Sequence, residues 1–266
     1  RWQLLLRGLG HPLGARASGA IYMGGLGLIA APARSGEALR GLWLQRRHGI
    51  PLRIGVAATA AERLLDLASA LGVLAWGLGL RRQRAGLAVA LLLLAGLAWL
   101  LSHPATLGWL ERALGRLRLP LGRPWRGLQR VLREALQALA ALRMLLRPLP
   151  LVLGLALTTA VWLLESALLQ LVLARLGASG IGLEEASVVR TATSLGGVLS
   201  LLPAGLGTSE LTSVGLALVY GANQAQALAA TVVLRAVTLL LPSLVGLLSL
   251  SLQPDLQQLR HHKPAP

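Results

Sequence analysis

Long uncharged or nearly uncharged runs alternate with short basic segments along this chain. The runs lie at 17–31, 64–80, 85–102, 148–174, 191–209 and 211–234, and the last continues past Arg235 to about residue 252. A helix of a soluble Leu/Ala bundle, which is the alternative, shows a charged face at every turn, and "AGLAVALLLLAGLAWLL" at 85–101 has none. We therefore expect an all-α, polytopic transmembrane helix bundle.

Two stretches interrupt the expected helices. They are "APARSGEALR" at 31–40 and "LPAGLGTSEL" at 202–211, and in each an apolar run is followed by Pro-Ala and then by a glycine and a glutamate that open a new helix. A long helix from near Leu52 to about Leu80 follows the first break. Inside a bilayer the backbone groups freed by such a break must be satisfied by protein or by cavity water.

The two breaks indicate a weak internal repeat. Arg63 lies 31 residues after Pro32 and Arg235 lies 32 residues after Pro203, each in the following long helix. We expect a single integral membrane domain over 1–266, with two broken or re-entrant helix pairs in an inverted repeat. Its parts are repeat one at about 17–102, a basic amphipathic cytoplasmic linker at about 103–149, repeat two at about 150–252 and a polar tail at 253–266. Because the chain opens with "RWQLLLRGLG", which is typical of the end of a membrane helix, we expect a truncated N-terminus.

Composition agrees with a membrane protein. Hydrophobic residues make up 55% of the chain, charged residues 14%, and the mean hydropathy is +0.64. The formal charge of +16 comes from arginines bunched between the apolar runs, nine of them from Arg112 to Arg147. The positive-inside bias makes this side cytoplasmic and predicts a multi-pass protein of the bacterial inner membrane. With no Phe and two Tyr, the chain lacks the stacking residues of a nucleic-acid binder.

The stretch 125–147 has helical amphipathic spacing. On a helical wheel one side holds Arg126, Arg130, Arg133 and Arg147, and leucines gather on the other. One interpretation is an interfacial helix with its basic heads on anionic lipid. The other is a cytoplasmic helix packed on its own domain.

Catalytic chemistry finds little support. The chain has no cysteine, and its five histidines, at 11, 48, 103, 261 and 262, show no ligand spacing. No Ser-His-Asp order appears. We expect no metal, no cofactor and no enzymatic activity.

Five segments together resemble the lysylphosphatidylglycerol synthase transmembrane region, also called the flippase-like domain family: "RWQLLLRGLG", "APARSGEALR", "AAERLLDL", "LPAGLGTSE" and "ALAATVVLRAVTLLLPSLVG". The resemblance covers nearly the whole chain, and members of the family look like lipid translocators. The positions that match its motifs are Pro32, Gly36, Glu37, Arg40, Glu62, Arg63, Asp66, Pro203, Gly205, Gly207, Glu210 and Arg235. The family often has a basic residue before the last glutamate, where this chain has Ser209, so the charge balance at this break differs.

The resemblance and the residues together predict a flippase-like translocase. It would move a phospholipid or polyprenyl-phosphate-type anionic lipid between leaflets; the alternative is a non-catalytic scaffold or accessory subunit of a cell-envelope lipid or glycan enzyme. The expected partners are therefore membrane lipids with anionic head groups and an envelope-biosynthesis enzyme. The residues leave the oligomeric state open.

Charged residues within the expected spans are the candidate site, because charge is costly in a bilayer, roughly 2.5–3.5 kcal/mol on insertion scales. The substrate-binding candidates are Glu37, Arg40, Arg63, Pro203, Gly205, Gly207, Glu210 and Arg235. The candidates for a supporting ion network are Glu62, Asp66, Glu165 and Arg190. Arginines match phosphate oxygens bidentately. The alternative for Glu62, Arg63 and Asp66 is a purely structural network. The two glutamates that open helices, Glu37 and Glu210, could instead interact with the helix dipole. Glu165 could carry a coupling proton or bind Arg190.

Overall fold

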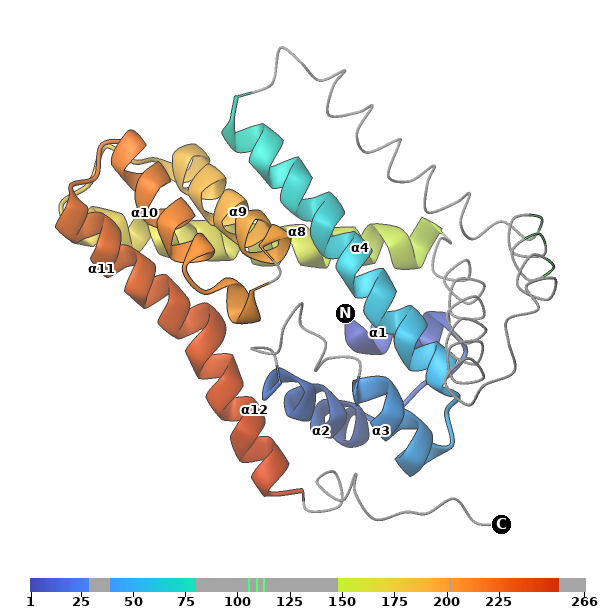
Figure 1. Ribbon diagram of the computed structural model, residues 1–266. Coiled ribbons are helices and arrows are strands. Elements are labelled where there is room, and N and C mark those ends of the chain that lie inside the picture. The colour runs from blue at the N-terminus through green and yellow to red at the C-terminus, as the bar shows by residue number, and fades with distance from the viewer. Residues whose placement is uncertain are drawn as a thin grey trace.

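The computed structural model describes residues 1–28, 39–79, 148–200 and 202–253, with Ala105, Trp109 and Arg112 between them. The regular structure in these ranges is helical (Figure 1). The first part of the chain forms α1 (Trp2–Gly8), α2 (Ala15–Leu26), α3 (Leu39–His48) and α4 (Leu52–Gly77). The second part forms α8 (Pro148–Arg175), α9 (Leu183–Leu199), a 3-10 turn (Pro203–Gly205), α10 (Thr208–Val219), α11 (Gln224–Arg235), a π-helical turn (Ala236–Leu240) and α12 (Leu241–Ser251).

Local signals fix the ends of several helices. Pro51 precedes α4, where its fixed φ suits the residue before a helix. Asn223 caps α11 by accepting a hydrogen bond from the Gln226 N–H at 2.9 Å, and Gln226 Oε1 accepts one from the Asn223 N–H at 2.8 Å. Gly221, with φ of +98°, turns the chain between α10 and α11, a conformation that glycine adopts without strain. The uncharged run 211–234 therefore holds parts of two helices rather than one.

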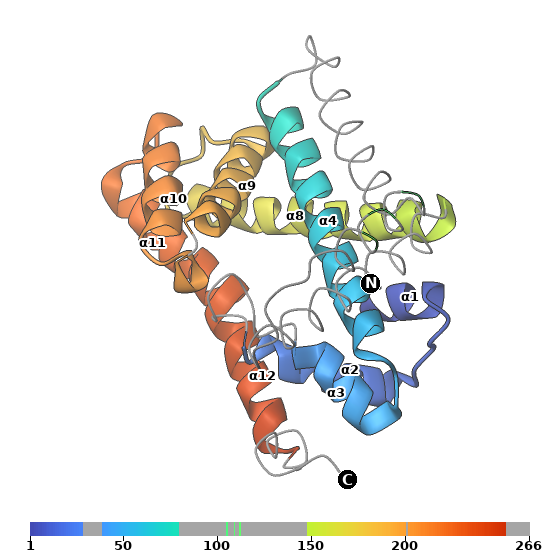
Figure 2. The ribbon, with the colours of Figure 1, turned by 45° about the vertical axis from the view of Figure 1, so that its right-hand side comes forward.

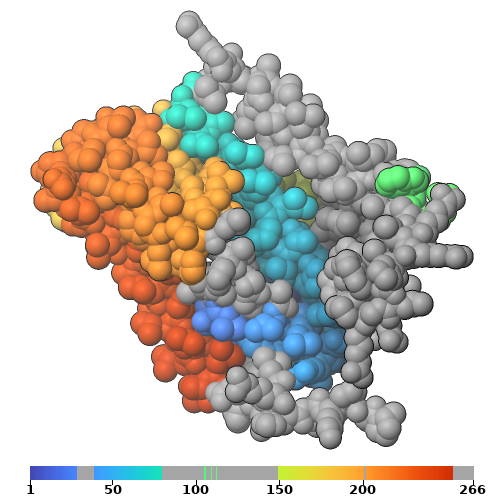
Figure 3. Space-filling view, in the orientation of Figure 1, coloured from blue at the N-terminus to red at the C-terminus, as the bar shows by residue number. Residues whose placement is uncertain are grey.

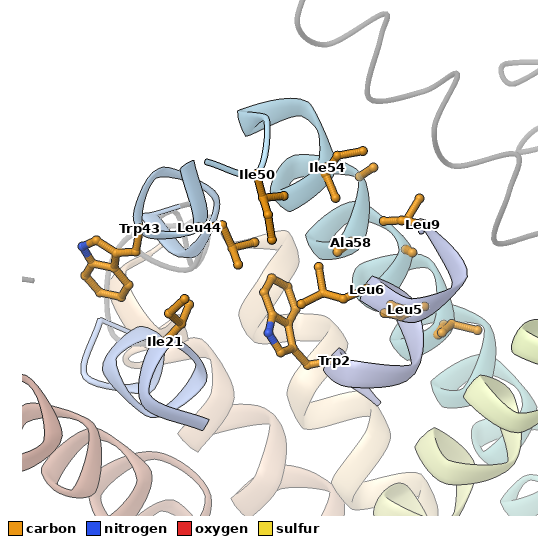
Figure 4. Close-up of a cluster of buried hydrophobic side chains, with 13 residues drawn as sticks. Trp2, Leu5, Leu6, Leu9, Ile21, Trp43, Leu44, Ile50, Ile54 and Ala58 are labelled. Atoms are coloured by element: carbon orange, nitrogen blue, oxygen red, sulfur yellow. The ribbon is translucent and has the colours of Figure 1, made fainter. Parts of the chain in front are cut away.

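Each part of the chain has its own apolar core. In the first part, Trp2, Leu5 and Leu6 of α1 meet Leu44 of α3 and Ala58 of α4 (Figure 4). In the second part, a separate cluster joins α8, α9, α10 and α11, and its fully or nearly fully buried members include Leu169, Leu173, Val189, Ala227 and Leu234. The chain thus packs as two helix groups.

One long helix of each group packs against helices of the other group, and these contacts join the two groups. Helix α4 of the first group packs against α8 and α9 of the second, and α12, which continues α11, packs against α2 of the first (Figures 1 and 2). Glycines allow the closest approaches. A Cβ on Gly246 of α12 would collide with the backbone of Gly27, directly after α2, and a Cβ on Gly77 of α4 would lie 2.6 Å from the Glu184 carbonyl oxygen of α9.

Two helices among the described residues are long and apolar enough to cross a membrane, Leu149–Arg175 and Gln224–Ser251. In the most apolar window of each, 17% of the residues are buried. The core helix of a soluble protein would instead be mostly buried, whereas these two present rows of exposed Leu and Val. The expected spans at 52–80 and 148–174 are confirmed as helices α4 and α8. The expected span at 85–102 and the stretch 125–147 lie outside the described residues.

Candidate functional site at the second helix break

The second break is a strained turn between α9 and α10. After α9 ends, Pro203–Gly205 form a single 3-10 turn, and α10 begins at Thr208. Ala204 has φ of +54°, Gly205 +65° and Gly207 +83°. Left-handed backbone is disfavoured for every residue except glycine, so Ala204 is held in a conformation that it does not prefer.

The glycines of the break serve two different purposes. A Cβ on Gly205 would lie 2.7 Å from Gly197 Cα and 2.7 Å from Ser209 Oγ, so this residue lets the turn lie against α9. Apart from its two chain neighbours, no described residue lies within 4 Å of the place where a Cβ on Gly207 would be, so it is the positive φ that favours glycine there. Both glycines are expected either for close approach of backbone to a phosphate or for a positive φ. The structure has the positive φ at both, and the approach to a phosphate stays a prediction.

An arginine from α11 ties the break together. Arg235 Nε donates to Glu210 Oε1 at 2.6 Å, and Arg235 Nη2 donates to the Ala204 carbonyl oxygen at 2.9 Å. The second carboxylate oxygen, Glu210 Oε2, accepts the Gly207 N–H at 2.7 Å. The anion at the start of α10 is thus the helix's own Glu210. Arg235 is 18% exposed and Glu210 35%, so both remain accessible from outside.

The surroundings of this pair are apolar. The leucines in and beside the turn between α9 and α10 are all exposed: Leu199, Leu202, Leu206 and Leu211. The helices α9 to α12 form the surface along one side of the molecule (Figure 3). A molecule that reached Arg235 there would meet aliphatic side chains as well as the ion pair, which suits an amphiphile.

The helix that carries Arg235 changes its geometry directly after it. Residues Ala236–Leu240 form a π-helical turn, in which the Leu241 N–H donates to the Ala236 carbonyl. Pro242 has no N–H for the carbonyl four residues before it, and its ring crowds that carbonyl. The proline accounts for the widened turn. Such turns are frequent at functional sites.

The first break lies outside the described residues, and with it Pro32, Gly36 and Glu37. The charged residues that follow it form a network between α3, α4 and the start of the chain. Arg40 Nη1 lies 2.9 Å from Glu62 Oε2, Arg1 pairs with both Glu62 and Asp66, and Arg63 Nη1 lies 3.1 Å from Asp66 Oδ2. Of the four residues expected in a supporting ion network, Glu62 and Asp66 are thus joined here, through Arg1, Arg40 and Arg63, whereas Glu165 and Arg190 form a separate pair.

Arg40 is enclosed. Its side chain is 2% exposed, and its guanidinium carbon lies 5.1 Å from the ring centre of Trp2 and 5.0 Å from that of Tyr22. Its partner Glu62 is fully buried. Gly25 of α2 makes room for Arg40, because a Cβ there would lie 2.7 Å from Arg40 Cγ. A lipid head group has no access to this arginine in the observed arrangement.

A third pair joins α8 and α9. Arg190 Nε donates to Glu165 Oε2 at 2.9 Å, and Arg190 Nη2 lies 2.6 Å from the same oxygen. The guanidinium carbon lies 4.9 Å from the ring centre of Trp162. Of the two alternatives for Glu165, the structure contains the bond to Arg190. Whether Glu165 also carries a proton stays a prediction.

Sequence reasoning missed several participants, among them the rings of Tyr22 and Trp162, which contact Arg40 and Arg190. Arg1 and Trp2 belong to the first network, and Ala204 supplies the carbonyl that Arg235 binds. The proline and glycines of the break pointed to the neighbourhood of Ala204, but nothing marked its positive φ. Arg1 carried no signal, because it is far from Asp66 along the chain.

The transmembrane region of lysylphosphatidylglycerol synthase has a family model that matches residues 1–246. The chain belongs to this family. It is also 36% identical over 74 residues to "Glycosyltransferase AglD" of Haloferax volcanii, a match that covers 27% of this chain and 12% of that protein. The match thus reaches only a small part of that relative. No solved structure matches the chain at a significant level.

The suspected family is thereby confirmed, and the chain is a helical membrane protein. The family assignment changes the meaning of the ion pairs described above. Glu165 and Arg235 lie within the two candidate membrane spans, where charge is costly and is usually kept for function or for mutual pairing.

Proposed function

We propose that the chain is a lipid translocase of the bacterial inner membrane and not an enzyme. Its cargo would be a phospholipid or polyprenyl-phosphate-type anionic lipid. The observation that carries the proposal is Arg235, an accessible arginine on an apolar candidate span, bound to a helix break among exposed leucines. Interrupted helices that meet inside a membrane form the substrate sites of many secondary transporters.

The packing of the two helix groups supports an inverted repeat. Each group has a helix before a break, a short helix after it and a long helix next: α2, α3 and α4 in one, α9, α10 and α11–α12 in the other. The long helix of each group packs on the helix that precedes the break in the other group: α4 packs on α9, and α12 packs on α2. Reciprocal exchange of this kind is expected when two copies of one unit are related by a pseudo-twofold axis.

The ion pairs repeat as well, with the charges reversed. In the first group Arg40 of the short helix binds Glu62 of the long helix, and in the second group Glu210 of the short helix binds Arg235 of the long one. The exchange of sign preserves the bond between the two helices.

Lipid transfer measured per folded molecule tests the proposal. Purified protein is reconstituted in vesicles with a fluorescent phosphatidylglycerol, and transfer is followed by quenching of the outer leaflet. Arg235→Gln should lower the rate about tenfold or more, because a charge-assisted contact to the phosphate is lost. Arg175→Gln, at the exposed end of α8, is the matched control and should transfer lipid normally. Normal specific activity of Arg235→Gln would overturn the proposal.

A second candidate is the accessory role for an envelope glycan enzyme. It is favoured by the similarity of one segment to a protein called a glycosyltransferase. In this case the reconstituted wild-type protein transfers no lipid, and instead a cell-envelope enzyme co-purifies with it and loses activity when the chain is removed.

A further inference from the structure

We infer that Arg235 acts as a latch: its bonds hold the turn of the second helix break and the start of α10 against α11. We infer further that a lipid phosphate which binds Arg235 breaks these bonds, so that the turn moves away from α11. The inference rests on the proposed function, since the phosphate belongs to the lipid that the protein moves. It adds a conformational step to that function, and it assigns separate tasks to Arg235, Ala204 and Glu210.

One guanidinium closes a ring of contacts across the break. It binds the Ala204 carbonyl in the turn and the Glu210 carboxylate in the first turn of α10, while Glu210 binds the Gly207 N–H between them. Arg235 therefore holds both ends of the connection from α9 to α10 against α11. Loss of its bonds removes this support from the turn and from the start of α10 together.

The turn is under strain in the latched form. Ala204 is the one residue other than glycine with positive φ among the described residues. Since alanine disfavours this conformation, relaxation of the turn is favourable once its carbonyl is released. The bond from Arg235 Nη2 is what opposes that relaxation. A glycine at position 204 would remove the strain and keep the turn closed.

A phosphate competes for the same group. Its oxygens match the guanidinium fork as well as a carboxylate does, and two anions on one arginine repel each other. Arg235 and Glu210 are open enough for a head group to arrive. Released Glu210 keeps the Gly207 N–H and stays at the start of α10, where a negative charge is favourable.

In the part of the first helix group that the structure describes, the Arg40–Glu62 pair lacks the properties of a latch. Arg40 and Glu62 are buried and Arg40 is enclosed by two aromatic rings, so an incoming anion does not reach them. Directly after Arg235, by contrast, α11 continues into the π-helical turn, the irregular point of this long helix. We therefore place the movement at the second break.

Distances between spin labels test the latch. The chain has no cysteine, so Leu206→Cys in the turn and Val232→Cys on α11, both exposed, accept labels without further changes. Leu164→Cys with Leu171→Cys, both on α8, is the control pair. The protein is held in dodecyl maltoside, which has no phosphate, and receives phosphatidylglycerol, diacylglycerol with the same chains, or inorganic phosphate.

A latch predicts one short distance in detergent and a second, longer one after addition of phosphatidylglycerol but not of diacylglycerol. Arg235→Gln should show the longer distance without lipid. In Ala204→Gly the ratio of the short to the long distance should rise about tenfold, and phosphatidylglycerol should lengthen the distance less than in the wild type. Should Arg235→Gln fail to fold, Ala204→Gly carries the test. The control pair should not change.

The inference is overturned if Arg235→Gln keeps the short distance, if Ala204→Gly responds to phosphatidylglycerol like the wild type, or if inorganic phosphate opens the turn and phosphatidylglycerol does not. Lipid transfer in the same variants separates the two proposals. Transfer without any change of distance removes the latch alone. A lipid-dependent change of distance without transfer removes the translocase and leaves the latch.

Discussion

Replacement of Arg40 by methionine should be the most destabilising single change at any of the three groups of ion pairs. Among the described residues, it leaves the fully buried Glu62 carboxylate with Arg1 as its one cationic partner, whose Nε lies 3.4 Å from Glu62 Oε1. Removal of one partner from a buried ion pair costs about 3–5 kcal/mol. The lost contacts of Arg40 with the rings of Trp2 and Tyr22 add about 1 kcal/mol.

Arg63→Met is the matched control. Its bond to Asp66 is made one turn away on the same helix, and the two side chains are 37% and 22% exposed. Pairs of this kind contribute about 0–1 kcal/mol. The two substitutions remove the same charge from the same network, so the difference between them, several kcal/mol, measures what burial adds.

The double variant Arg40→Met with Glu62→Met refines the test. It removes both buried charges, and such replacements are often neutral or stabilising. It should therefore recover most of the stability that Arg40→Met loses. Unfolding in mixed micelles with increasing dodecyl sulfate, followed by tryptophan fluorescence, gives the free energies, because Trp2 and Trp43 both lie in this core. If the free energies of unfolding of Arg40→Met and Arg63→Met differ by less than about 1 kcal/mol, the buried pair does not stabilise the first helix group.

Three further predictions follow from the backbone and the charge pattern. Gly246→Ala should weaken the contact of α12 with α2, because its Cβ collides with Gly27, and should lower the midpoint of dodecyl sulfate unfolding. Gly207→Val should abolish lipid transfer, because valine disfavours the φ of +83° at this position, and should leave expression largely intact, because no described residue beyond the chain neighbours would clash with its Cβ. Degradation of the variant protein would instead indicate a structural break. Labelling of introduced cysteines should place 103–149 in the cytoplasm and 81–84 outside, and external labelling of 103–149 would reverse the orientation.

The helices and the second break were predictable because their signals are local. Uncharged runs of sufficient length gave α4 and α8, and Pro203 with two glycines marked the interruption. Arg235 was suspected because a charge stood inside an apolar run. Each of these features lies within one turn or one helix, and the physical cost of charge or of a missing N–H acts at that scale.

What the sequence did not predict depends on contacts between distant segments. Arg1 meets Asp66 only because α1 packs against α4. Gly205 lies so close to Gly197 of α9 that a Cβ on it would be 2.7 Å from the Gly197 Cα, and this contact could not be predicted from residues 202–211 alone. The positive φ of Ala204 follows from the path that the turn must take between α9 and α10, which no pattern in the residues 202–211 specifies.

The three Arg–Glu hydrogen bonds among the described residues show why the candidate site needed the structure. The partners are 22, 25 and 25 residues apart, so spacing does not distinguish them. Their burial does. Arg40 with Glu62 is closed to solvent and lipid, and a buried pair broken by a ligand would leave an uncompensated charge behind. Arg235 with Glu210 is open on one side, and its carboxylate keeps a helix start as a second partner. An incoming phosphate can exchange with this pair at low cost, and for that reason the head group is expected at the second break.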